Sequence, residues 1–278
     1  MPAESDRDRA GSHPGLVAAQ REGDLRALAR AISVVENREP GFDALLAETR
    51  RGLTPRAHRV GITGPPGVGK SSLVRELVRR LRARGETVAV LAVDPSSDKS
   101  GGALLGDRIR MGELGSDAGV FFRSMAAREA LGGLAPGAAD ALDLMDAFGF
   151  SRVLVETVGV GQSERAVAGS VDSVVVVLMP GQGDSIQAMK AGMTEIADLF
   201  VVNKAELGGA ERLSRELREA LELGVPRADG WSPPILATTA ESGVGVDALL
   251  DELDRHRAAP REGAGPRIRD WGGVTAEE

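Results

Sequence analysis

The sequence predicts an α/β fold in which a mostly parallel β-sheet is flanked by helices, with a helical extension at the amino-terminal end. Two observations lead to this prediction. From residue 59 onward, short apolar runs alternate with stretches in which apolar residues recur at helical spacing, which is typical of parallel strands connected by helices. A glycine-rich loop also lies between the first apolar run and the first helical stretch. A chain of 278 residues buries about three-quarters of its unfolded surface, so a sizeable core is expected.

Helices are expected before the sheet. Residues 16–37 carry apolar side chains at the spacing of one amphipathic helix, and a second, shorter helix is expected around residues 42–46. Gly52 and Pro55 then indicate a linker. The apolar positions of the two helices are Leu25, Leu28, Ile32, Val35, Phe42, Leu45 and Leu46.

Six apolar runs are expected to form the buried strands of the sheet, because they are short and are bounded by turn-forming residues. They are residues 60–63, 88–93, 153–155, 174–179, 199–202 and 235–237. Helices are expected between them, at residues 71–84, 137–148, 186–197, 210–222 and 246–256.

This pattern divides the chain into four parts. Residues 1–14 are expected to be a disordered tail, residues 15–55 a helical extension, and residues 56–256 the domain that contains the sheet. Residues 257–278 are rich in proline, glycine and charged residues, so a flexible carboxyl-terminal tail is expected there.

Composition excludes several kinds of site. The chain has no cysteine, which rules out disulfides, thiolate metal sites and thiol nucleophiles, and its three histidines are too scattered to indicate a metal cluster. A net charge of −7 and 3% aromatic residues argue against a nucleic-acid partner. The longest aliphatic run is too short to span a membrane, and the amino terminus lacks the apolar stretch of a secretory signal. We therefore expect a cytoplasmic protein without a membrane partner.

Residues 64–71 read GPPGVGKS, which matches the phosphate-loop pattern G-x-x-x-x-G-K-S in its expected place between a strand and a helix. The glycines let backbone N–H groups turn toward phosphates, and the helix amino terminus adds its positive end. Lys70 is expected to reach the β and γ phosphates, and Ser71 to bind magnesium. The loop fits a kinase, an ATPase or a GTPase of the P-loop NTPase fold. Its predicted nucleotide-binding residues are Gly67, Val68, Gly69, Lys70, Ser71 and Ser72.

Residues 203–206 follow a predicted strand and read NKAE, which resembles the guanine motif N-K-x-D of GTPases. In that motif the carboxylate accepts hydrogen bonds from two donors that adenine does not present, and Asn203, Lys204 and Glu206 are assigned to base binding accordingly. Glu206 has one methylene more than aspartate, so guanine selectivity is expected to be looser. Thr239 and Ala240, after the next strand, resemble the S-A loop that offers a backbone N–H to the guanine oxygen. A turn that begins a helix is the alternative interpretation of residues 203–206.

Two carboxylates follow predicted strands. Asp94 comes after residues 88–93, and Glu156 comes after residues 153–155. Both would lie beside the phosphate loop if these strands neighbour the first one. Magnesium is commonly held by one or two carboxylates together with phosphate oxygens. The alternative role of such a residue is to cap a helix.

Four segments together resemble the MeaB/ArgK family of phosphate-loop GTPases, over about residues 16–256. Members of this family are G-protein chaperones of coenzyme B12-dependent acyl-CoA mutases such as methylmalonyl-CoA mutase. They couple GTP hydrolysis to loading and protection of the cofactor. The segments, in the same order as in the family, are GPPGVGKS (64–71), AVDPSS (92–97), GGALLGDRIRM (101–111) and VETVGVGQSE (155–164).

The resemblance implies a GTPase that binds GTP or GDP with Mg²⁺. It implies that Lys70 contacts phosphate, and that the Gly159 N–H senses the γ phosphate, so that Lys70, Glu156 and Gly159 are the expected catalytic residues. Gln162 would either orient water or brace its loop. The residues expected around magnesium are Ser71, Asp94, Asp107 and Glu156.

The resemblance also implies two switch segments and a mutase partner. Residues 94–111 would form one switch, and residues 180–192 would form a second one that faces the mutase. In the second segment the family sequence GDELQGIKKG is replaced by GDSIQAMKAG, residues 183–192, which puts in doubt any salt bridge of the missing acid and second lysine. The family's helical dimerisation arm is not recognisable in residues 257–278, so homodimerisation stays open.

Three other functions remain as alternatives. A small-molecule kinase would use the same phosphate loop. A metal-delivery GTPase is the second alternative, although such proteins need cysteine or histidine near the site. A targeting GTPase would need a basic or methionine-rich binding module, which the sequence lacks.

Overall fold

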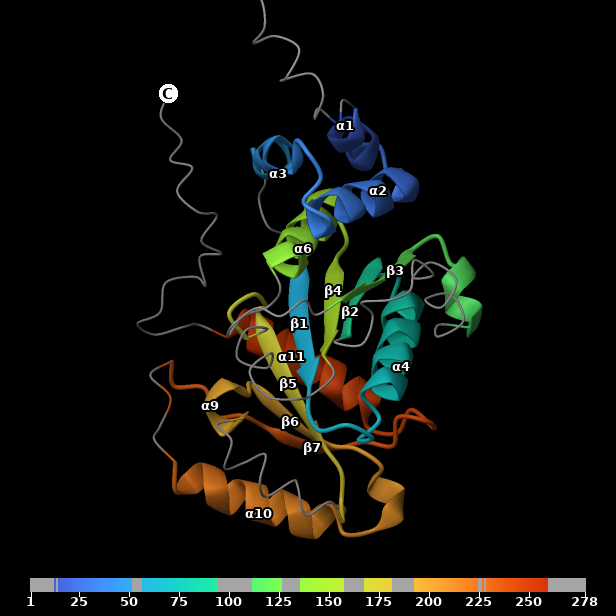
Figure 1. Ribbon diagram of the computed structural model, residues 1–278. Helices are drawn as coiled ribbons and strands as arrows, with labels where there is room; N and C mark the ends of the chain where they lie inside the picture. The colour runs from blue at the N-terminus through green and yellow to red at the C-terminus, as the bar shows by residue number, and fades with distance from the viewer. Residues whose placement is uncertain are drawn as a thin grey trace, which may run out of the picture.

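The computed structural model describes residues 13, 15–51, 57–94, 112–126, 136–157, 168–181, 193–224, 227 and 229–259. In these residues seven strands form one sheet in the order β3-β2-β4-β1-β5-β6-β7 (Figure 1). Every neighbouring pair is parallel, so the predicted α/β fold is confirmed. The strands are β1 (His58–Thr63), β2 (Val88–Asp94), β3 (Val120–Ala126), β4 (Arg152–Thr157), β5 (Ser173–Leu178), β6 (Leu199–Val202) and β7 (Ile235–Ala237).

Helices cover both faces of this sheet, as a buried parallel sheet requires. Because side chains alternate along a strand, each face has its own apolar core. In β5, Val174 and Val176 belong to the core of one face, and Val175 and Val177 belong to the core of the other. The first face packs against α6 (Pro136–Phe148) and α10 (Ala210–Glu222), and the second against α4 (Lys70–Ala83) and α11 (Val246–Ala258).

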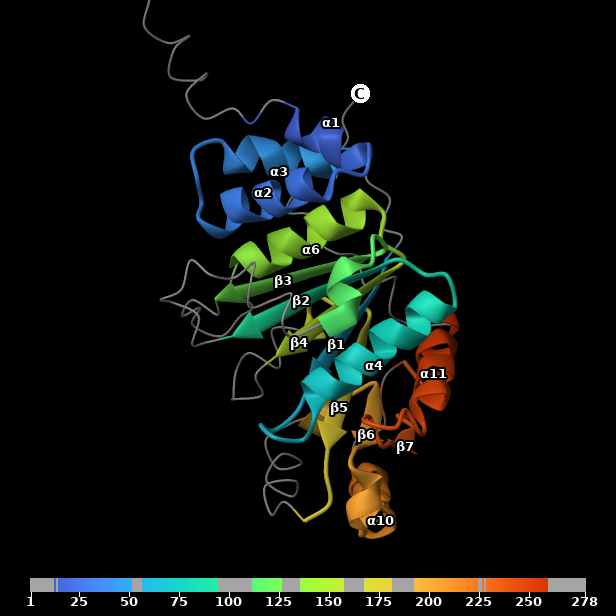
Figure 2. The ribbon, with the colours of Figure 1, turned by 90° about the vertical axis from the view of Figure 1, so that its right-hand side faces the viewer.

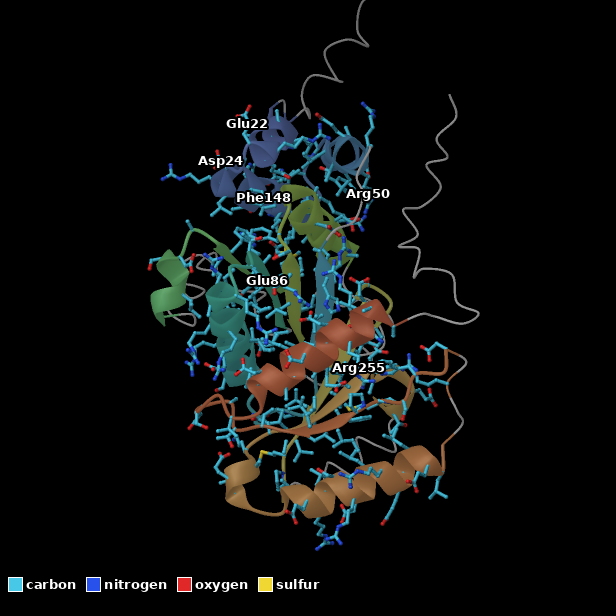
Figure 3. The ribbon with its side chains drawn as sticks, turned by 180° about the vertical axis from the view of Figure 1, so that it is seen from behind. Glu22, Asp24, Arg50, Glu86, Phe148 and Arg255 are labelled. Atoms are coloured by element: carbon cyan, nitrogen blue, oxygen red, sulfur yellow. The ribbon has the colours of Figure 1, made fainter. Side chains whose placement is uncertain are left out.

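Three amino-terminal helices form an additional layer on top of α6 (Figure 2). They are α1 (Leu16–Arg21), α2 (Leu25–Glu36) and α3 (Phe42–Arg50). Figure 3 shows Arg50 where α3 meets α6. Its guanidinium lies 2.8 Å from Asp140 and 2.7 Å from Asp143 of α6. Asp143 also pairs with the buried Arg59 of β1 at 2.9 Å, so ion pairs connect this layer to the sheet through α6.

The structure differs from the predicted elements in two places. Residues 16–37 form two helices rather than one, because Gly23 adopts a left-handed φ of 89° and the Asp24 side chain caps α2 by accepting from the Arg26 and Ala27 N–H groups. Strand β3 was not predicted, because the polar Arg123 and Ser124 interrupt its apolar run. Arg123 is nevertheless buried, since its guanidinium pairs with Glu36 of α2 at 2.6 Å.

The six predicted strands and four of the five helices expected between them are found close to their expected bounds. Of the helix expected at residues 186–197, the described residues include only α9 (Thr194–Ile196) at its end. The described residues also include two short 3₁₀ helices, η1 (Gly112–Ser116) and η3 (Ala205–Leu207). Among the described helices, none is both long and apolar enough to cross a bilayer.

Candidate nucleotide site

The glycine-rich loop connects the carboxyl end of β1 to the amino end of α4. Gly64, its first residue, has a φ of 137°, and a Cβ there would lie 2.0 Å from the Val177 carbonyl oxygen of β5. Gly69, the residue before α4, has a φ of 94°, and a Cβ there would lie 2.5 Å from Asn203 Nδ2. Only glycine fits at these two positions, because both the backbone conformation and the close neighbours exclude a side chain.

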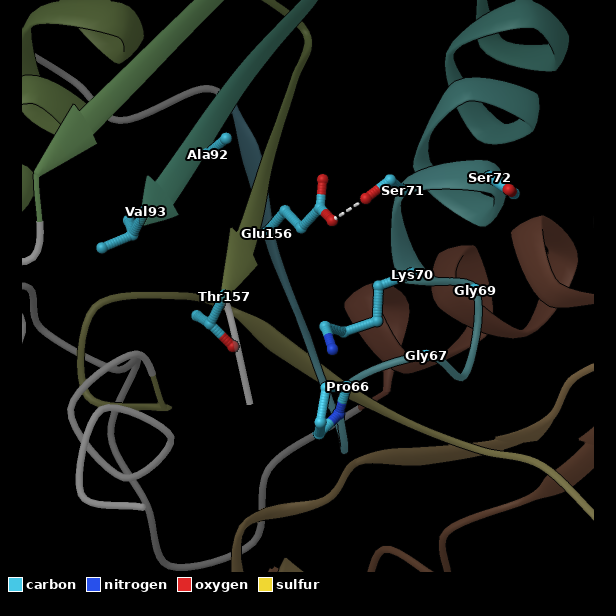
Figure 4. Close-up of a pocket in the computed structure, with 10 residues that line it drawn as sticks. All are labelled: Pro66, Gly67, Gly69, Lys70, Ser71, Ser72, Ala92, Val93, Glu156 and Thr157. Atoms are coloured by element: carbon cyan, nitrogen blue, oxygen red, sulfur yellow. Dashed lines mark hydrogen bonds between the residues drawn. The ribbon is translucent and has the colours of Figure 1, made fainter. Parts of the chain in front are cut away.

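A pocket of about 390 Å³ opens beside this loop (Figure 4). It lies at the carboxyl ends of β1, β2 and β4, which is where open α/β sheets bind ligands. Five of the six loop residues predicted to bind nucleotide line it. The sixth, Val68, has its side chain in the apolar core, and its carbonyl oxygen accepts a hydrogen bond from Asn203. The lining residues are Pro66, Gly67, Gly69, Lys70, Ser71, Ser72, Ala92, Val93, Glu156 and Thr157.

Lys70 holds the positive charge of the pocket. Its side chain is buried, and its Nζ donates to the carbonyl oxygens of Gly64 at 2.7 Å and Pro65 at 2.9 Å. These bonds keep the ammonium group inside the curve of the loop. A cation fixed beside backbone N–H groups is suited to bind an anionic phosphate.

Ser71 and Glu156 bring two side-chain oxygens together from different elements. The Ser71 hydroxyl donates to a Glu156 carboxylate oxygen across the pocket (Figure 4). Glu156 lies on β4 in register with Ile62 of β1 and Ala92 of β2, which places it in the middle of the sheet edge. A hydroxyl and a carboxylate fit Mg²⁺, which binds one or two protein oxygens together with phosphate oxygens and water.

The remaining predicted ligands of this region are only partly described. The backbone places Asp94 at the end of β2, which pairs with both β3 and β4. The Asp94 side chain lies outside the described residues, as do Asp107, Gly159, Gln162 and most of the two expected switch segments. No group of three or more acidic or histidine side chains suited to a metal occurs among the residues that the structure describes.

Asn203 connects the phosphate loop to the other end of the site. Its side chain is 1% exposed. Its Nδ2 donates to the Val68 carbonyl at 2.9 Å, and its Oδ1 accepts from the Thr238 hydroxyl at 3.0 Å and the Ala240 N–H at 3.1 Å. Asn203 therefore connects two loops. The Ala240 N–H, which belongs to the loop expected to offer a backbone N–H to guanine, donates to Asn203 in this structure.

Lys204 and Glu206 complete the predicted base site. The backbone of Lys204 has a left-handed φ of 56°. Its side chain runs along the phosphate loop, because its Cε would lie 3.7 Å from a Cβ atom added at Gly69. Glu206 lies in η3, after β6, and its carboxylate accepts a hydrogen bond of 2.8 Å from the Thr239 hydroxyl. This bond joins the two sequence segments that were predicted separately to bind guanine.

Sequence reasoning missed two threonines of this region. Thr157 lines the pocket, and its hydroxyl donates to the buried Thr63 hydroxyl at 3.0 Å at the ends of β4 and β1. Thr238 donates to Asn203, as described above. The signal for both was their place at the carboxyl end of a predicted strand, the same signal that identified Glu156.

Comparison with known proteins gives a family match over most of the chain. The family model described as "Methylmalonyl Co-A mutase-associated GTPase MeaB" matches residues 28–269. A protein of Pyrococcus horikoshii named as a GTPase is 47% identical over 244 residues, which are 87% of this chain and 77% of that protein.

Two further relatives extend this comparison. The "Methylmalonic aciduria type A homolog, mitochondrial" of Mus musculus is 39% identical over 257 residues, 87% of this chain and 61% of that protein. A solved structure named "LAO/AO transport system kinase" has a TM-score of 0.71 at 28% identity, and the match covers 93% of this chain and 77% of that one.

Proposed function

The chain belongs to the MeaB family and is a GTPase of the P-loop fold, and from this premise we propose that it serves a coenzyme B12-dependent acyl-CoA mutase of the methylmalonyl-CoA mutase type. In this proposal, GTP hydrolysis is coupled to loading or protection of the mutase cofactor. The description of the matching family and the name of the mouse relative support the partner. We further propose that the protein acts in the cytoplasm. A homodimer is compatible with this proposal but is not required by it.

The observation that carries the proposed chemistry is the position of Lys70, Ser71 and Glu156 around one pocket. GTP would bind with its phosphates in the curve of the glycine-rich loop. The Lys70 ammonium group would contact the β and γ phosphates, and Ser71 and Glu156 would hold Mg²⁺. When bound, this ion neutralises charge on the phosphates.

These groups act by position and charge rather than by forming covalent bonds. Phosphoryl transfer needs an attacking water in line with the leaving oxygen and positive charge near the γ phosphate. Lys70 supplies fixed positive charge, because two carbonyl oxygens hold its ammonium group. We propose that the Gly159 N–H binds the γ phosphate and so distinguishes GTP from GDP.

Guanine selectivity is proposed to come from the loops that Asn203 braces. Glu206 would accept hydrogen bonds from the guanine ring N–H and amino group, while the Lys204 stem would lie along the base. The hydrogen bond that Glu206 accepts from the Thr239 hydroxyl supports this role of Glu206, because the bond orients the longer glutamate side chain. Adenine presents no such donor pair to Glu206, so these hydrogen bonds would not form with ATP, which disfavours it.

The partner is tested by measuring GTP turnover with and without a B12-dependent mutase from the same organism. We expect the mutase to accelerate hydrolysis by about tenfold or more, because ordering of the catalytic groups by a partner accelerates such GTPases strongly. Lys70→Ala is the control, in which both rates should fall together. No acceleration by any B12-dependent mutase of that organism would contradict the proposal.

The same assay distinguishes the kinase alternative, which the name of the solved relative raises for this chain. With GTP labelled at the γ phosphate, the proposed function predicts that all label appears as inorganic phosphate. A kinase would transfer the label to an acceptor molecule. Label recovered on a small molecule in a cell extract would therefore replace the chaperone proposal.

A further inference from the structure

Arg80, in the third turn of α4, contacts the segment between β7 and α11. Its three guanidinium nitrogens have three different partners. Nε pairs with Glu76 of the same helix at 2.8 Å, Nη2 donates to the Gly243 carbonyl oxygen at 3.3 Å, and Nη1 donates to Asp247 in the first turn of α11. A guanidinium spreads its N–H groups over three nitrogens and so reaches three separate acceptors, whereas all three N–H groups of a lysine lie on one nitrogen.

The contact with Gly243 is close on the side of α4. Gly243 has a φ of 75°, and a Cβ there would lie 2.4 Å from Glu76 Oε1 and 2.5 Å from Arg80 Nη2. Glu76 and Arg80 therefore fill the space beside this glycine. The segment cannot move closer to α4, and the hydrogen bond from Arg80 keeps it from moving away.

Gly243 belongs to the same tight turn as Thr239. The Gly243 N–H donates to the Thr239 carbonyl at 2.9 Å, and the Thr239 N–H donates to the Val244 carbonyl at 3.0 Å. Thr239 in turn donates its hydroxyl to Glu206. We call residues 239–244 the base loop, since they include the residues proposed to face guanine. The position of Gly243 thus determines the position of Thr239 and, through it, the orientation of Glu206.

Helix α4 also carries the phosphate-binding residues. It begins at Lys70 and Ser71, and Arg80 is ten residues further along, a distance of about 15 Å at the rise of an α-helix. Leu73, Leu77 and Leu81 on the buried side of α4 have no exposed surface, so the helix is fixed to the sheet. One rigid helix therefore carries both the residues proposed to bind phosphate and the contact to the base loop.

From these contacts we infer that Arg80 is a positioning residue for nucleotide binding, which sets the spacing between the phosphate loop and the base loop. This inference rests on the proposed guanine site. A nucleotide must reach both loops at once, so a base loop released from α4 would bind it less tightly. A ligand that contacts only the phosphate loop would not be affected.

Arg84, four residues after Arg80 and the C-cap residue of α4, provides a matched control. Its guanidinium pairs with Asp251 at 3.0 Å and Asp254 at 3.6 Å, and it approaches Asp247 at 4.0 Å. All three partners belong to α11, which lies beside α4 (Figure 2). Arg84→Ala therefore removes ion pairs between the same two helices without removing a contact to Gly243.

The experiment compares dissociation constants for GDP and for inorganic pyrophosphate in the wild type, Arg80→Ala and Arg84→Ala. For Arg80→Ala we expect the GDP constant to rise about fivefold or more, at the lower end of typical coupling between two sites, with pyrophosphate binding unchanged. The KM for GTP should rise by a larger factor than the factor by which turnover at saturating GTP falls. Arg84→Ala should bind both ligands as the wild type does.

Arg80→Lys covers the case in which Arg80→Ala does not fold, because a lysine keeps the charge beside Glu76 and Asp247 but cannot also reach Gly243. It should weaken GDP binding with pyrophosphate binding unchanged. Equal GDP affinity in the Arg80 and Arg84 variants would overturn the inference, as would an equal loss of GDP and pyrophosphate binding. If the wild-type protein bound ADP as tightly as GDP, that result would instead refute the proposed guanine site.

Discussion

At the carboxyl edge of the sheet, Lys70, Ser71 and Glu156 line a pocket beside the glycine-rich loop. At the amino edge, by contrast, polar side chains that begin the strands are buried and bonded to one another. His58 begins β1, Arg152 begins β4 and Ser173 begins β5. All three are buried. The two edges therefore contain similar kinds of residues in different surroundings.

The hydrogen bonds of the amino edge run in one direction. Arg152 donates to His58 Nδ1 at 2.6 Å, and since arginine can only donate, this nitrogen must accept. His58 Nε2 then carries the proton and donates to the Ser173 hydroxyl at 2.8 Å. Ser173 donates in turn to His256 Nδ1 at 2.7 Å, and His256 Nε2 faces Asp198 at 3.4 Å. This chain of bonds links β4, β1, β5 and α11.

The difference shows how one sheet separates stability from ligand binding. At the amino edge the polar side chains of the hydrogen-bonded series bond to other protein groups, so removing one side chain leaves a buried partner without its hydrogen bond. At the carboxyl edge Lys70, Ser71 and Glu156 also bond to protein groups, but they line an open pocket, where a ligand can bind them as well. Substitutions at the amino edge should lower stability, and substitutions at the carboxyl edge should lower nucleotide binding.

The largest effect is expected at the amino edge, from Asp198→Ala. The Asp198 carboxylate has no exposed surface, accepts from the Val174 N–H at 2.8 Å and pairs with Arg227 at 2.9 Å. Breaking a buried pair of this kind costs about 3 to 5 kcal/mol of unfolding free energy. Urea unfolding measures this loss. The control is Glu252→Ala in α11, which removes a partly exposed carboxylate paired with the exposed Arg255 and should cost less than about 1 kcal/mol. A stable Asp198→Ala protein would show that this edge does not hold the strands together.

The next effect is expected at the carboxyl edge, from Lys70→Ala. Removing the fixed ammonium group should weaken GTP binding by about 100-fold, the equivalent of one strong hydrogen bond to a charged group. Titration calorimetry measures the affinity, and a melting curve without nucleotide should stay within a few degrees of the wild type. If instead stability fell and affinity did not, the proposed division between the edges would be wrong.

A smaller effect is expected on base selectivity, from Glu206→Ala. We expect the ratio of ADP to GDP dissociation constants to fall by about tenfold, since a single selective hydrogen-bonding group is lost. Glu211→Ala, an exposed acid in the first turn of α10, controls for the lost charge. Thr239→Val should give a weaker loss in the same direction, because it removes only the hydroxyl that orients Glu206. An unchanged ratio in Glu206→Ala would remove this residue from the base site.

The smallest effect is the pH dependence of a pair next to the amino edge. The Arg227 hydrogen bond lowers the pKa of Asp229 to about 2, from an ordinary value of 3.8. A group with a lowered pKa stabilises the fold above its unfolded pKa, and this contribution is lost as the pH falls from about 4 to about 2. The difference in urea midpoint between wild type and Asp229→Asn should therefore shrink over this range. A difference that stays constant would show that the pair contributes nothing through its charge.

Much of the fold could be predicted because its signals are local. The phosphate loop is one continuous motif, and the central strands are unbroken apolar runs. Strand β3 was not predicted, because Arg123 is polar by type and its burial involves contacts with Ser33 and Glu36 of α2, which are distant in the sequence. The break between α1 and α2 depended on the single turn at Gly23.

The amino edge could not be predicted, because its partners are far apart in the sequence. Ser173 is 115 residues from His58 and 83 residues from His256, so histidines that look scattered in the sequence meet at one hydroxyl in the structure. The brace made by Asn203 has the same origin, since its bond to Val68 spans 135 residues. The motif identified Asn203 as important, but only the fold shows which groups it joins.

The most direct test of the account is a calorimetric titration of the wild-type protein with GDP and with ADP, in the presence of magnesium. The account predicts one binding site for GDP and an affinity for ADP that is lower by about tenfold or more. Equal affinities, or no heat of binding with GDP, would contradict the claim that the carboxyl edge of this sheet is a guanine-nucleotide site.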